Sequence, residues 1–156
     1  MHILVTGAAG YIGSHVVKQL IEETTHEISV IDNLSTGHEA TIDRLNAIFK
    51  ETRDGEITFY HEDLKNFDAI ETIFKAASFD AVIHFAASIV VPESVENPLK
   101  YYMNNTVNTT HLIKLCNVYG LKHFIFSSTA AVYGEPDASQ VTELTPTQPI
   151  NPYGRS

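Results

Sequence analysis

The chain has little with which to build a disulfide scaffold or a membrane anchor. Cys116 is the single cysteine among 156 residues, so no disulfide framework can form within the chain. No apolar run approaches the 18 or so residues that a membrane-spanning helix needs. The first predicted strand begins next to Met1, which leaves no room for a secretory signal peptide. We therefore expect a cytoplasmic protein without a membrane partner.

Basic residues are also scarce. Lys and Arg number 10 against 19 Asp and Glu, which gives a net charge of −9 and argues against nucleic acid as a partner. The 8 histidines are scattered, and none forms a helical i, i+4 pair, so no metal site is expected. Ser127 and Ser128 do not lie in a Gly-x-Ser-x-Gly turn, which argues against a hydrolase.

The chain does contain a regular alternation of strand-like and helix-like segments. Apolar runs predict strands over residues 3–6, 27–31, 57–60, 81–85 and 124–127, and helical periodicity predicts helices over 11–23, 40–50, a segment capped by Asn66, and 98–119. The proline-rich tail, 135–152, is predicted to be a loop. Alternating strands and helices indicate the α/β class, a Rossmann-like doubly wound parallel sheet of about five strands. Residues 1–156 are expected to form one domain of this class.

The most informative stretch is the glycine-rich turn between the first strand and the first helix. Gly7 allows a sharp turn, Gly10 leaves the backbone open to a pyrophosphate, and Gly13 lets the helix approach the strand. Tyr11 and Ile12 begin the helix, whose N-terminal N–H groups can bind phosphate. The alternative is an ordinary glycine turn without a ligand.

An acidic residue follows at the spacing that a dinucleotide site requires. Asp32 ends the second apolar run, about 20 residues after the glycines. Its carboxylate can accept hydrogen bonds from both hydroxyls of an adenosine ribose and would repel a 2′-phosphate, so NAD is favoured over NADP. Asn33 then begins a polar loop that ends at Gly37.

Further candidates follow the third and fourth strands. Asp63 can accept a hydrogen bond from the adenine amino group while Leu64 packs on the ring. The alternative is a surface acid beside a core leucine. Phe85, Ala86 and Ala87 follow the fourth strand; two alanines suit the approach of a flat ligand, although small residues also suit tight packing.

Hydroxyl groups follow the fifth strand and end the chain. Ser127, Ser128 and Thr129 can hold a substrate hydroxyl or cap turns. Tyr153 follows the prolines; a tyrosine becomes a useful base when a nearby cation favours its phenolate. With Thr129 close by, Tyr153 can exchange a proton with a sugar hydroxyl, although a structural tyrosine is the alternative.

Six motifs together make the sequence resemble the extended short-chain dehydrogenase/reductase superfamily, most closely its UDP-glucose 4-epimerase family. They are TGAAGYIGSH at 6–15, DNLSTG at 32–37, HFAA at 84–87, ESVENPLKYYMNN at 93–105, FSSTAAVYG at 126–134 and NPYGRS at 151–156. Related dehydratases usually carry an acidic residue where this chain has Ala130 and Ala131. The resemblance therefore implies an epimerase rather than a dehydratase.

The resemblance also implies a mechanism. NAD takes a hydride from C4 of a UDP-hexose while Tyr153 takes the proton of the 4-hydroxyl. The 4-keto sugar turns over, and the hydride returns to its other face, which interconverts UDP-glucose and UDP-galactose. Thr129 is expected to bind the 4-oxygen, and Ser127 and Asn104 to support cofactor or substrate. Ile89 departs from the family, because many relatives have a cofactor-holding lysine there.

The larger departure lies at the end of the chain. The family motif is Tyr-x-x-x-Lys, and from Tyr153 its lysine would follow Ser156, the last residue. We also do not expect these 156 residues to include the sugar-binding carboxyl-terminal domain of the family. The resemblance further implies a homodimer for the full-length form, formed partly through the helix at 98–119. We expect these residues to bind NAD weakly without turning over UDP-galactose.

Several alternatives remain open at this stage. The chain can be a non-catalytic NAD-binding module, or part of another nucleotide-sugar epimerase or dehydratase. It can also be an assembly fragment that needs a second chain, in which case the helix at 98–119 exposes an apolar face.

Overall fold

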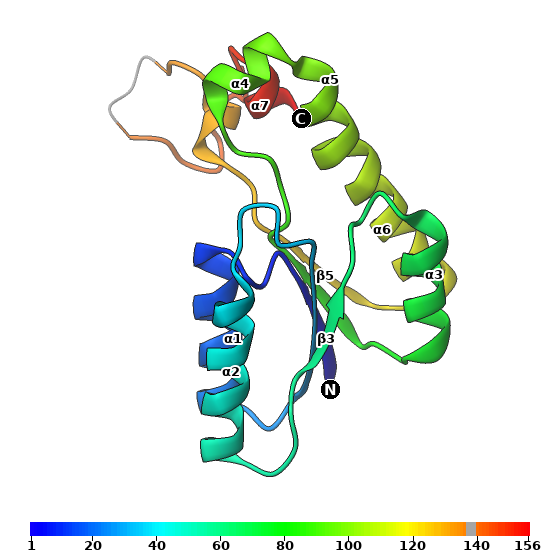
Figure 1. Cartoon of the computed structure of the whole chain (residues 1–156). Coiled ribbons are helices and arrows are strands. Elements are labelled where there is room, and N and C mark those ends of the chain that lie inside the picture. The colour runs from blue at the N-terminus through cyan, green and yellow to red at the C-terminus, as the bar shows by residue number, and fades with distance from the viewer. Residues whose placement is uncertain (137–139) are drawn as a thin grey trace. The chain divides into compact units, whose positions relative to one another are not determined.

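A parallel sheet forms the centre of the fold. The computed structural model describes residues 1–136 and 140–156. Within these residues five parallel strands occur in the order β3-β2-β1-β4-β5 (Figure 1). They are β1 (His2–Thr6), β2 (Glu27–Asp32), β3 (Thr58–His61), β4 (Ala81–His84) and β5 (His123–Phe126). The order reverses between β1 and β4, which is where doubly wound proteins bind ligands, and the predicted fold class is confirmed.

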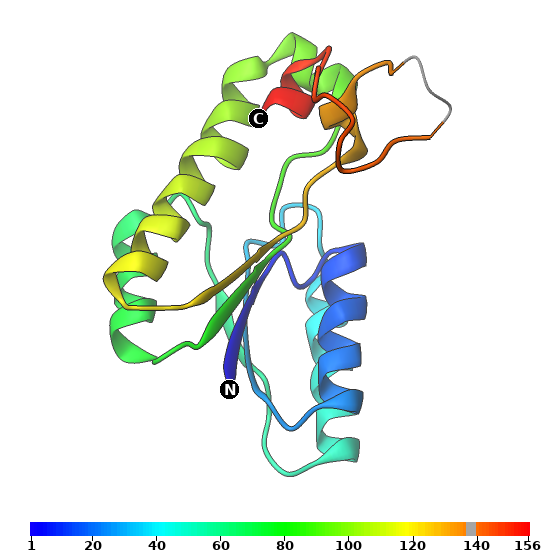
Figure 2. The same ribbon diagram turned by 180° about the vertical axis from the view of Figure 1, so that it is seen from behind.

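Helices cover both faces of this sheet (Figures 1 and 2). On one face, α1 (Tyr11–Glu23) and α2 (Glu39–Thr52) bury Val17, Ile21 and Leu45 with side chains of the strands. On the other face, α3 (Phe67–Ala76) and α6 (Asn108–Val118) bury Phe74 and Leu112. The sheet is therefore apolar on both sides, as a parallel sheet with crossover helices must be.

The helix α1 packs on the sheet through one face. Ile12 lies outside that face, and its side chain is 55 % exposed. The residues that face the sheet are Gly13, Val17 and Ile21. A Cβ on Gly13 would collide with the Gly7 carbonyl, so helix and turn meet at this glycine and the helix is oriented by that contact.

The described chain divides into two compact units. Unit one comprises residues 1–86 and 111–126 and contains the entire five-stranded sheet; unit two comprises residues 87–110 and 127–156. Unit two consists of short elements: α4 (Val91–Glu96), α5 (Pro98–Tyr101), the π-helix η1 (Tyr102–Val107), the 3₁₀-helix η2 (Ala130–Tyr133) and α7 (Pro152–Arg155). The first residues of α6 also belong to it.

Four local predictions need correction. The single helix predicted over 98–119 is divided into α5, η1 and α6. The helix α4 was not predicted. The tail was predicted to be a loop, but Pro152 begins α7, in the first helical position where proline is tolerated. Asn66 precedes α3, but its side chain accepts no capping hydrogen bond; its amide nitrogen donates to Glu62 Oε1.

Two predicted helix ends are confirmed. The Asn97 Oδ1 atom accepts a hydrogen bond from the Lys100 N–H at 3.3 Å and so caps α5. Gly120 has a φ of +72° after α6, a left-handed conformation that favours glycine at the end of a helix.

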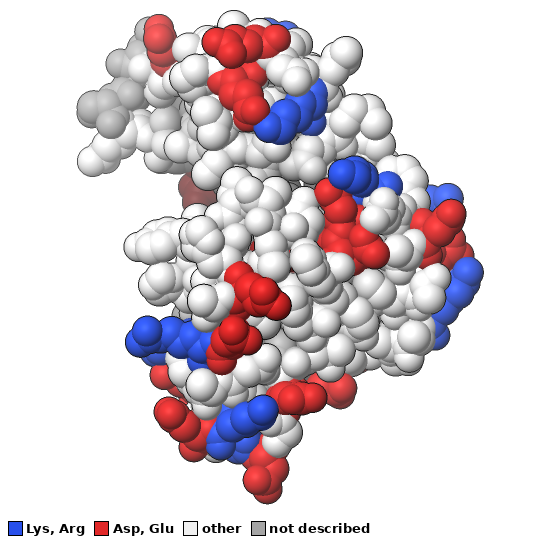
Figure 3. Space-filling view, in the orientation of Figure 1, with Lys and Arg blue, Asp and Glu red and all other residues white. Residues whose placement is uncertain are grey.

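Charged side chains are interspersed on the face shown in Figure 3, where acidic groups lie beside single Lys and Arg residues. Several pairs make ion pairs, among them Lys18–Glu22 at 2.7 Å and Lys100–Glu93 at 2.5 Å. Among the described residues, no helix is long and apolar enough to cross a membrane.

Candidate functional site

Gly7 joins the ends of three neighbouring strands. Its N–H donates to the Ile31 carbonyl of β2 at 2.9 Å, and its φ is +73°. A Cβ at this position would lie 2.6 Å from the Ala86 backbone nitrogen, just after β4. No larger residue fits here, so the architecture itself requires Gly7.

Gly10 differs from Gly7 and Gly13. A Cβ built on Gly10 would lie 3.3 Å from the Gly7 oxygen, a tight contact but a much milder one than the collisions at Gly7 and Gly13. Gly10 is the N-cap of α1, and no side chain caps this helix end. The missing side chain therefore leaves space beside N–H groups that favour a phosphate.

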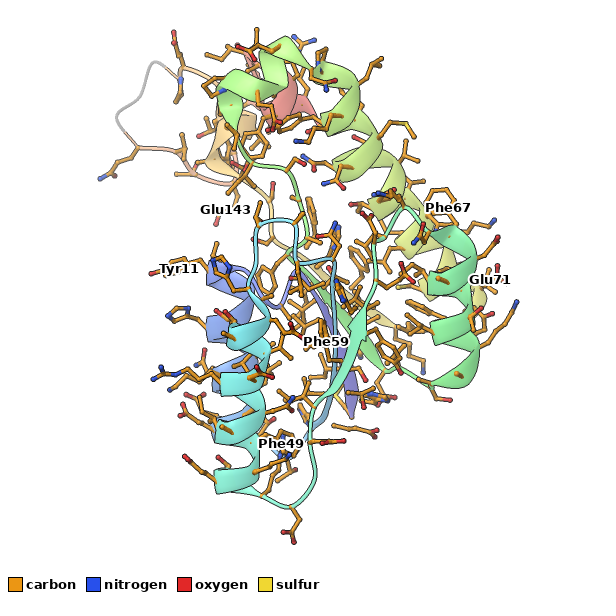
Figure 4. The ribbon with its side chains drawn as sticks, in the orientation of Figure 1. Tyr11, Phe49, Phe59, Phe67, Glu71 and Glu143 are labelled. Carbon is orange, nitrogen blue, oxygen red and sulfur yellow. The ribbon has the colours of Figure 1, made fainter. Side chains whose placement is uncertain are left out.

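The side chains of the first helical turn point away from the sheet. Tyr11 is 82 % exposed and lies beside His15, with ring centroids 4.8 Å apart (Figure 4). Ile12 is also exposed. At these two positions the backbone, rather than the side chain, is therefore the part available to a bound phosphate.

Asp32 is held in place from both sides. Its side chain is buried at the end of β2. The Oδ2 atom accepts a hydrogen bond from the Ala9 N–H, and the Oδ1 atom accepts one from the Leu34 N–H, each at 2.8 Å. Because a carboxylate has about four acceptor positions, each oxygen can accept a further bond from a ribose hydroxyl.

Leu34 adopts a backbone conformation that is costly for a branched residue. Its φ of 55° is positive, and such strain is concentrated at functional sites. The strained residue directs its N–H to Asp32. The loop after β2 thus fixes the orientation of the carboxylate.

Asp63 and Asn33 bring the loops after β3 and β2 together. The Asn33 amide donates to Asp63 Oδ2 at 3.0 Å, and the Lys65 N–H donates to Asp63 Oδ1 at 3.0 Å. Partial burial raises the pKa of Asp63, but hydrogen bonds from Lys65 and Asn33 outweigh it and the pKa is lowered. Leu64 is 7 % exposed and lies in the core. The adenine contacts of this pair stay a prediction.

The turn after β4 is attached to β1. The Phe85 N–H donates to the Thr6 carbonyl at 3.0 Å, and the Thr6 hydroxyl lies 2.5 Å from His84 Nδ1. His84 is 1 % exposed, and burial lowers its pKa to about 4. The sequence interpretation missed this pair, although His84 ends a buried apolar run and faces the end of the neighbouring strand.

Thr129 and Ser127 belong to unit two. The Thr129 hydroxyl accepts a hydrogen bond from the Ala131 N–H at 3.2 Å and so caps η2. Capping of a turn was one of the two roles expected for this hydroxyl. Ser127 is exposed. Ala130 and Ala131 form the first turn of η2, so the turn that follows Thr129 carries no acidic side chain at either position.

Tyr153 lies in the first turn of α7. Its ring meets the Tyr101 ring edge to face, with centroids 6.3 Å apart and an interplanar angle of 76°. The Tyr101 side chain is fully buried, and its hydroxyl accepts a hydrogen bond from the Val90 N–H at 2.9 Å. The sequence interpretation missed Tyr101; its position in a predicted helix was the only signal.

Asn104 contacts the segment that follows Ala87. Its amide donates to the Ser88 hydroxyl at 3.0 Å, while its Oδ1 accepts from Asn108 at 3.3 Å. The predicted site residues are thus divided between the two units. Unit one contains Gly7, Gly10, Tyr11, Ile12, Gly13, Asp32, Asn33, Asp63, Leu64, Phe85 and Ala86, whereas unit two contains Ala87, Asn104, Ser127, Thr129 and Tyr153.

The strand order, the glycine turn and the fixed carboxylate of unit one define a Rossmann-type nucleotide-binding protein. Residues 4–156 match the family described as GDP-mannose 4,6 dehydratase, and the chain belongs to this family.

The relatives are sugar-nucleotide epimerases. The chain is 46 % identical over 155 residues to UDP-arabinose 4-epimerase 1 of Arabidopsis thaliana, covering 99 % of this chain and 36 % of that protein. The UDP-Glc/GlcNAc 4-epimerase of Campylobacter jejuni is similar at 54 % identity and a TM-score of 0.91, and the match covers 99 % of this chain and 45 % of that one. The Bifidobacterium longum UDP-glucose 4-epimerase, solved with NAD+ and UDP, gives 35 % identity and a TM-score of 0.91, with the same coverage. The predicted resemblance is confirmed, and the chain spans less than half the length of these proteins.

Proposed function

We propose that this chain forms the NAD-binding part of an NAD-dependent nucleotide-sugar 4-epimerase, an isomerase that interconverts UDP-glucose and UDP-galactose through a 4-keto intermediate. The relatives support this proposal, since solved epimerases with the same fold hold NAD, UDP and UDP-sugars. When bound, NAD would supply a hydride acceptor and donor at C4 of the sugar.

The observation that carries the proposal is the contrast among the three glycines. A Cβ would collide with the backbone at Gly7 and Gly13, whereas at Gly10 it would make one tight contact, 3.3 Å from the Gly7 oxygen. Packing within the chain therefore requires glycine less strongly at Gly10, and at an uncapped helix N-terminus a ligand that approaches the backbone supplies a further reason for it. The pyrophosphate of NAD fits that space and the N–H groups of Tyr11 and Ile12.

The other residues of unit one have consistent roles. Asp32 would accept both hydroxyls of the adenosine ribose, because its orientation is already fixed by Ala9 and Leu34. Asn33, Asp63 and Leu64 would surround the adenine. Phe85 and Ala86 would line the strand end beside the cofactor.

In unit two, Tyr153 would remove the proton from the 4-hydroxyl of the sugar, and Thr129 would bind the same oxygen. Ala87, Ser127 and Asn104 would support cofactor or substrate. The alanines at 130 and 131 support an epimerase over a dehydratase, since neither supplies an acid. The whole protein would act on a UDP-hexose, or on a UDP-pentose or N-acetylhexosamine as relatives do.

We expect these 156 residues by themselves to bind NAD without turning over a UDP-sugar. They contain Tyr153 but no lysine four residues beyond it, and the matched epimerases use more than twice as many residues. We also propose a cytoplasmic homodimer for the full-length form. Exposed apolar side chains along α5 and η1, Leu99 and Met103, support a protein contact there.

Isothermal titration with NAD tests the cofactor proposal, with the Gly10→Ala and Asp32→Ala variants as probes. We expect measurable affinity in the wild type and a loss of about tenfold or more in each variant, which corresponds to about 1.4 kcal/mol or more. NADP should bind more weakly than NAD to the wild type. If a correctly folded chain gave no heat of binding on titration with NAD, the proposed cofactor site would be wrong.

A coupled assay with UDP-galactose tests the expected lack of turnover. Turnover at the rate of a full-length epimerase would contradict that expectation, while leaving NAD binding intact. A size measurement of the same sample reports whether the chain is a monomer, a dimer or an aggregate.

A further inference from the structure

An open cleft lies at the end of unit one that is remote from the glycine turn. The helix α1 begins at that turn and ends at the cleft, and its 13 residues separate the two by about 20 Å. The cleft has a volume of about 590 Å³, which is typical of a small-molecule site. Its walls come from the last residues of α1 and α2 and from the residues that follow these helices. The proposed function leaves this cleft without a role.

Arg53 follows α2 and forms one wall of the cleft. Its guanidinium lies over the ring of Phe49, with Cζ 4.4 Å from the ring centroid; Phe49 belongs to the last turn of α2 (Figure 4). The Nη1 atom of Arg53 donates a hydrogen bond to the Thr24 carbonyl at 2.9 Å. The stacking and the hydrogen bond together fix the plane of the guanidinium, so its remaining donors have defined directions.

Two donors of this guanidinium are left over. Nε and Nη2 of Arg53 are buried, and neither has a hydrogen-bond partner among the described residues. A buried donor without an acceptor is costly. In arginine, the Nε–H group and one N–H of Nη2 point the same way and form a fork that matches the two oxygens of a carboxylate or a phosphate. The two atoms without a partner are therefore the two that such an anion binds together.

The charges around the cleft favour one of these anions. Both α1 and α2 end here, so the negative ends of two helix dipoles lie beside it. Glu22 and Glu23 also line the cleft, although Glu22 is paired with Lys18 at 2.7 Å and Glu23 accepts a hydrogen bond from Gln19. These groups repel a doubly charged phosphate more strongly than a singly charged carboxylate.

We propose that the Nε–Nη2 edge of Arg53 binds the carboxylate of a small monocarboxylic acid in this cleft. Because both nitrogens are covered, the acid reaches them when the wall of the cleft moves. Thr25 and His26 form a part of that wall that lies outside any helix or strand, so the movement is expected there. The site is separate from the glycine turn and does not depend on NAD or on turnover.

The test follows the Nε–H resonance of Arg53 by NMR in the ¹⁵N-labelled 156-residue chain, while sodium acetate replaces sodium chloride just below neutral pH. Arg53→Lys identifies this resonance by its disappearance. We expect it to shift and to saturate as acetate is added, together with the backbone amides of Thr25 and His26. Arg44 and Arg155 are exposed, and their Nε–H resonances should show no saturable shift.

Arg53→Lys also tests the fork rather than the charge. The variant keeps the positive charge but lacks the planar pair of donors. Its affinity for acetate, measured from the amides of Thr25 and His26, should fall by about tenfold or more. Arg44→Lys makes the same exchange at an exposed position and should leave the affinity for acetate unchanged. Sodium phosphate is the second ligand and should bind at Arg53 more weakly than acetate.

Three results would overturn the proposal. The first is the lack of a saturable shift at Arg53 in the wild type, a result that needs no variant to fold. The second is equal affinity for acetate in the wild type and in folded Arg53→Lys, and the third is tighter binding of phosphate than of acetate at Arg53. NAD titration keeps the two proposals apart. Arg53→Lys should bind NAD as the wild type does, and absent NAD binding would contradict the proposed function alone.

Discussion

Units one and two are stabilised by different interactions. Unit one buries aliphatic and aromatic side chains on both faces of its sheet, and Leu4, Val5, Val17, Val30 and Val82 are fully buried. Unit two buries mainly polar groups, namely Ser94, Asn105, Asn108 and the Tyr101 side chain with its hydroxyl. Apolar burial is non-directional, whereas buried hydrogen bonds require defined partners. Unit one therefore suits a scaffold, and unit two suits the placement of reacting groups.

The largest effect is expected from the centre of the sheet. Leu4→Ala in β1 removes a fully buried side chain, and such substitutions cost about 3–5 kcal/mol through lost burial and a cavity. Chemical denaturation measures the loss. Leu99→Ala is the control, because Leu99 is 74 % exposed and its loss should change stability little. Equal effects at both positions would contradict the description of unit one.

Acid should weaken unit one through His84. Burial lowers the pKa of this group from 6.5 to about 4, so the unfolded chain takes up a proton more readily than the folded one. Neutral His84 makes its full contribution to the free energy of unfolding above pH 6.5, and this contribution is lost as the pH falls towards 4. The free energy of unfolding should fall by about 3 kcal/mol over this range.

Denaturation of the wild type and of His84→Asn across this range checks the effect. The variant should start less stable, because the contact with Thr6 changes, but it should lose less stability between pH 6.5 and 5. His38→Asn is the control, since His38 is exposed. Parallel curves for wild type and His84→Asn would exclude His84 as the source.

The two glycines of the turn should separate folding from binding. Gly13→Ala forces a Cβ onto the Gly7 carbonyl and should cost about 1–3 kcal/mol of stability, as overpacking does. Gly10→Ala places its methyl 3.3 Å from the Gly7 oxygen, a contact that a small shift relieves, so it should cost less stability than Gly13→Ala while NAD affinity falls. Thermal melts and NAD titration measure the two effects. Strong destabilisation by Gly10→Ala would remove the main support for the phosphate site.

A smaller effect is expected from the hydroxyl of Tyr101. Tyr101→Phe keeps the ring beside Tyr153 but leaves the Val90 N–H without its acceptor, which should cost about 1–2 kcal/mol. Tyr102→Phe, at a partly buried position next in the chain, is the matched control. A cost for Tyr101→Phe below that of Tyr102→Phe would contradict a unit held by directional bonds.

Much of unit one could be predicted because its signals are local. The strands are short apolar runs, and Gly7, Gly13 and Asp32 occur at spacings that a strand-turn-helix unit imposes. Which side of α1 faces the sheet could not be predicted in this way, because Ile12 is apolar yet exposed, whereas Val17 and Ile21 are buried. The close packing of Gly13 against the Gly7 carbonyl determines which side of α1 faces the sheet.

Unit two could be predicted less well. The π-helix η1 and the helix α4 have no simple periodic signal, and Asn105 is indistinguishable from Asn104 in the sequence. Their different partners arise because the wide turn of η1 directs neighbouring side chains to different atoms. Thr129 and Tyr153 were candidates from their places after the fifth strand and after the prolines, but their specific roles came from the family resemblance and stay predictions.

The sequence by itself determined the class of fold, the glycine turn and the acid that follows it, because apolar periodicity and glycine spacing act over a few residues. Only the tertiary structure decided that packing requires glycine less strongly at Gly10 than at Gly7 and Gly13, that Asp32 is fixed by two backbone N–H groups, and that Asn105 connects Ser88 to the turn of Tyr153. These facts depend on contacts between residues far apart in the chain, which no local pattern encodes.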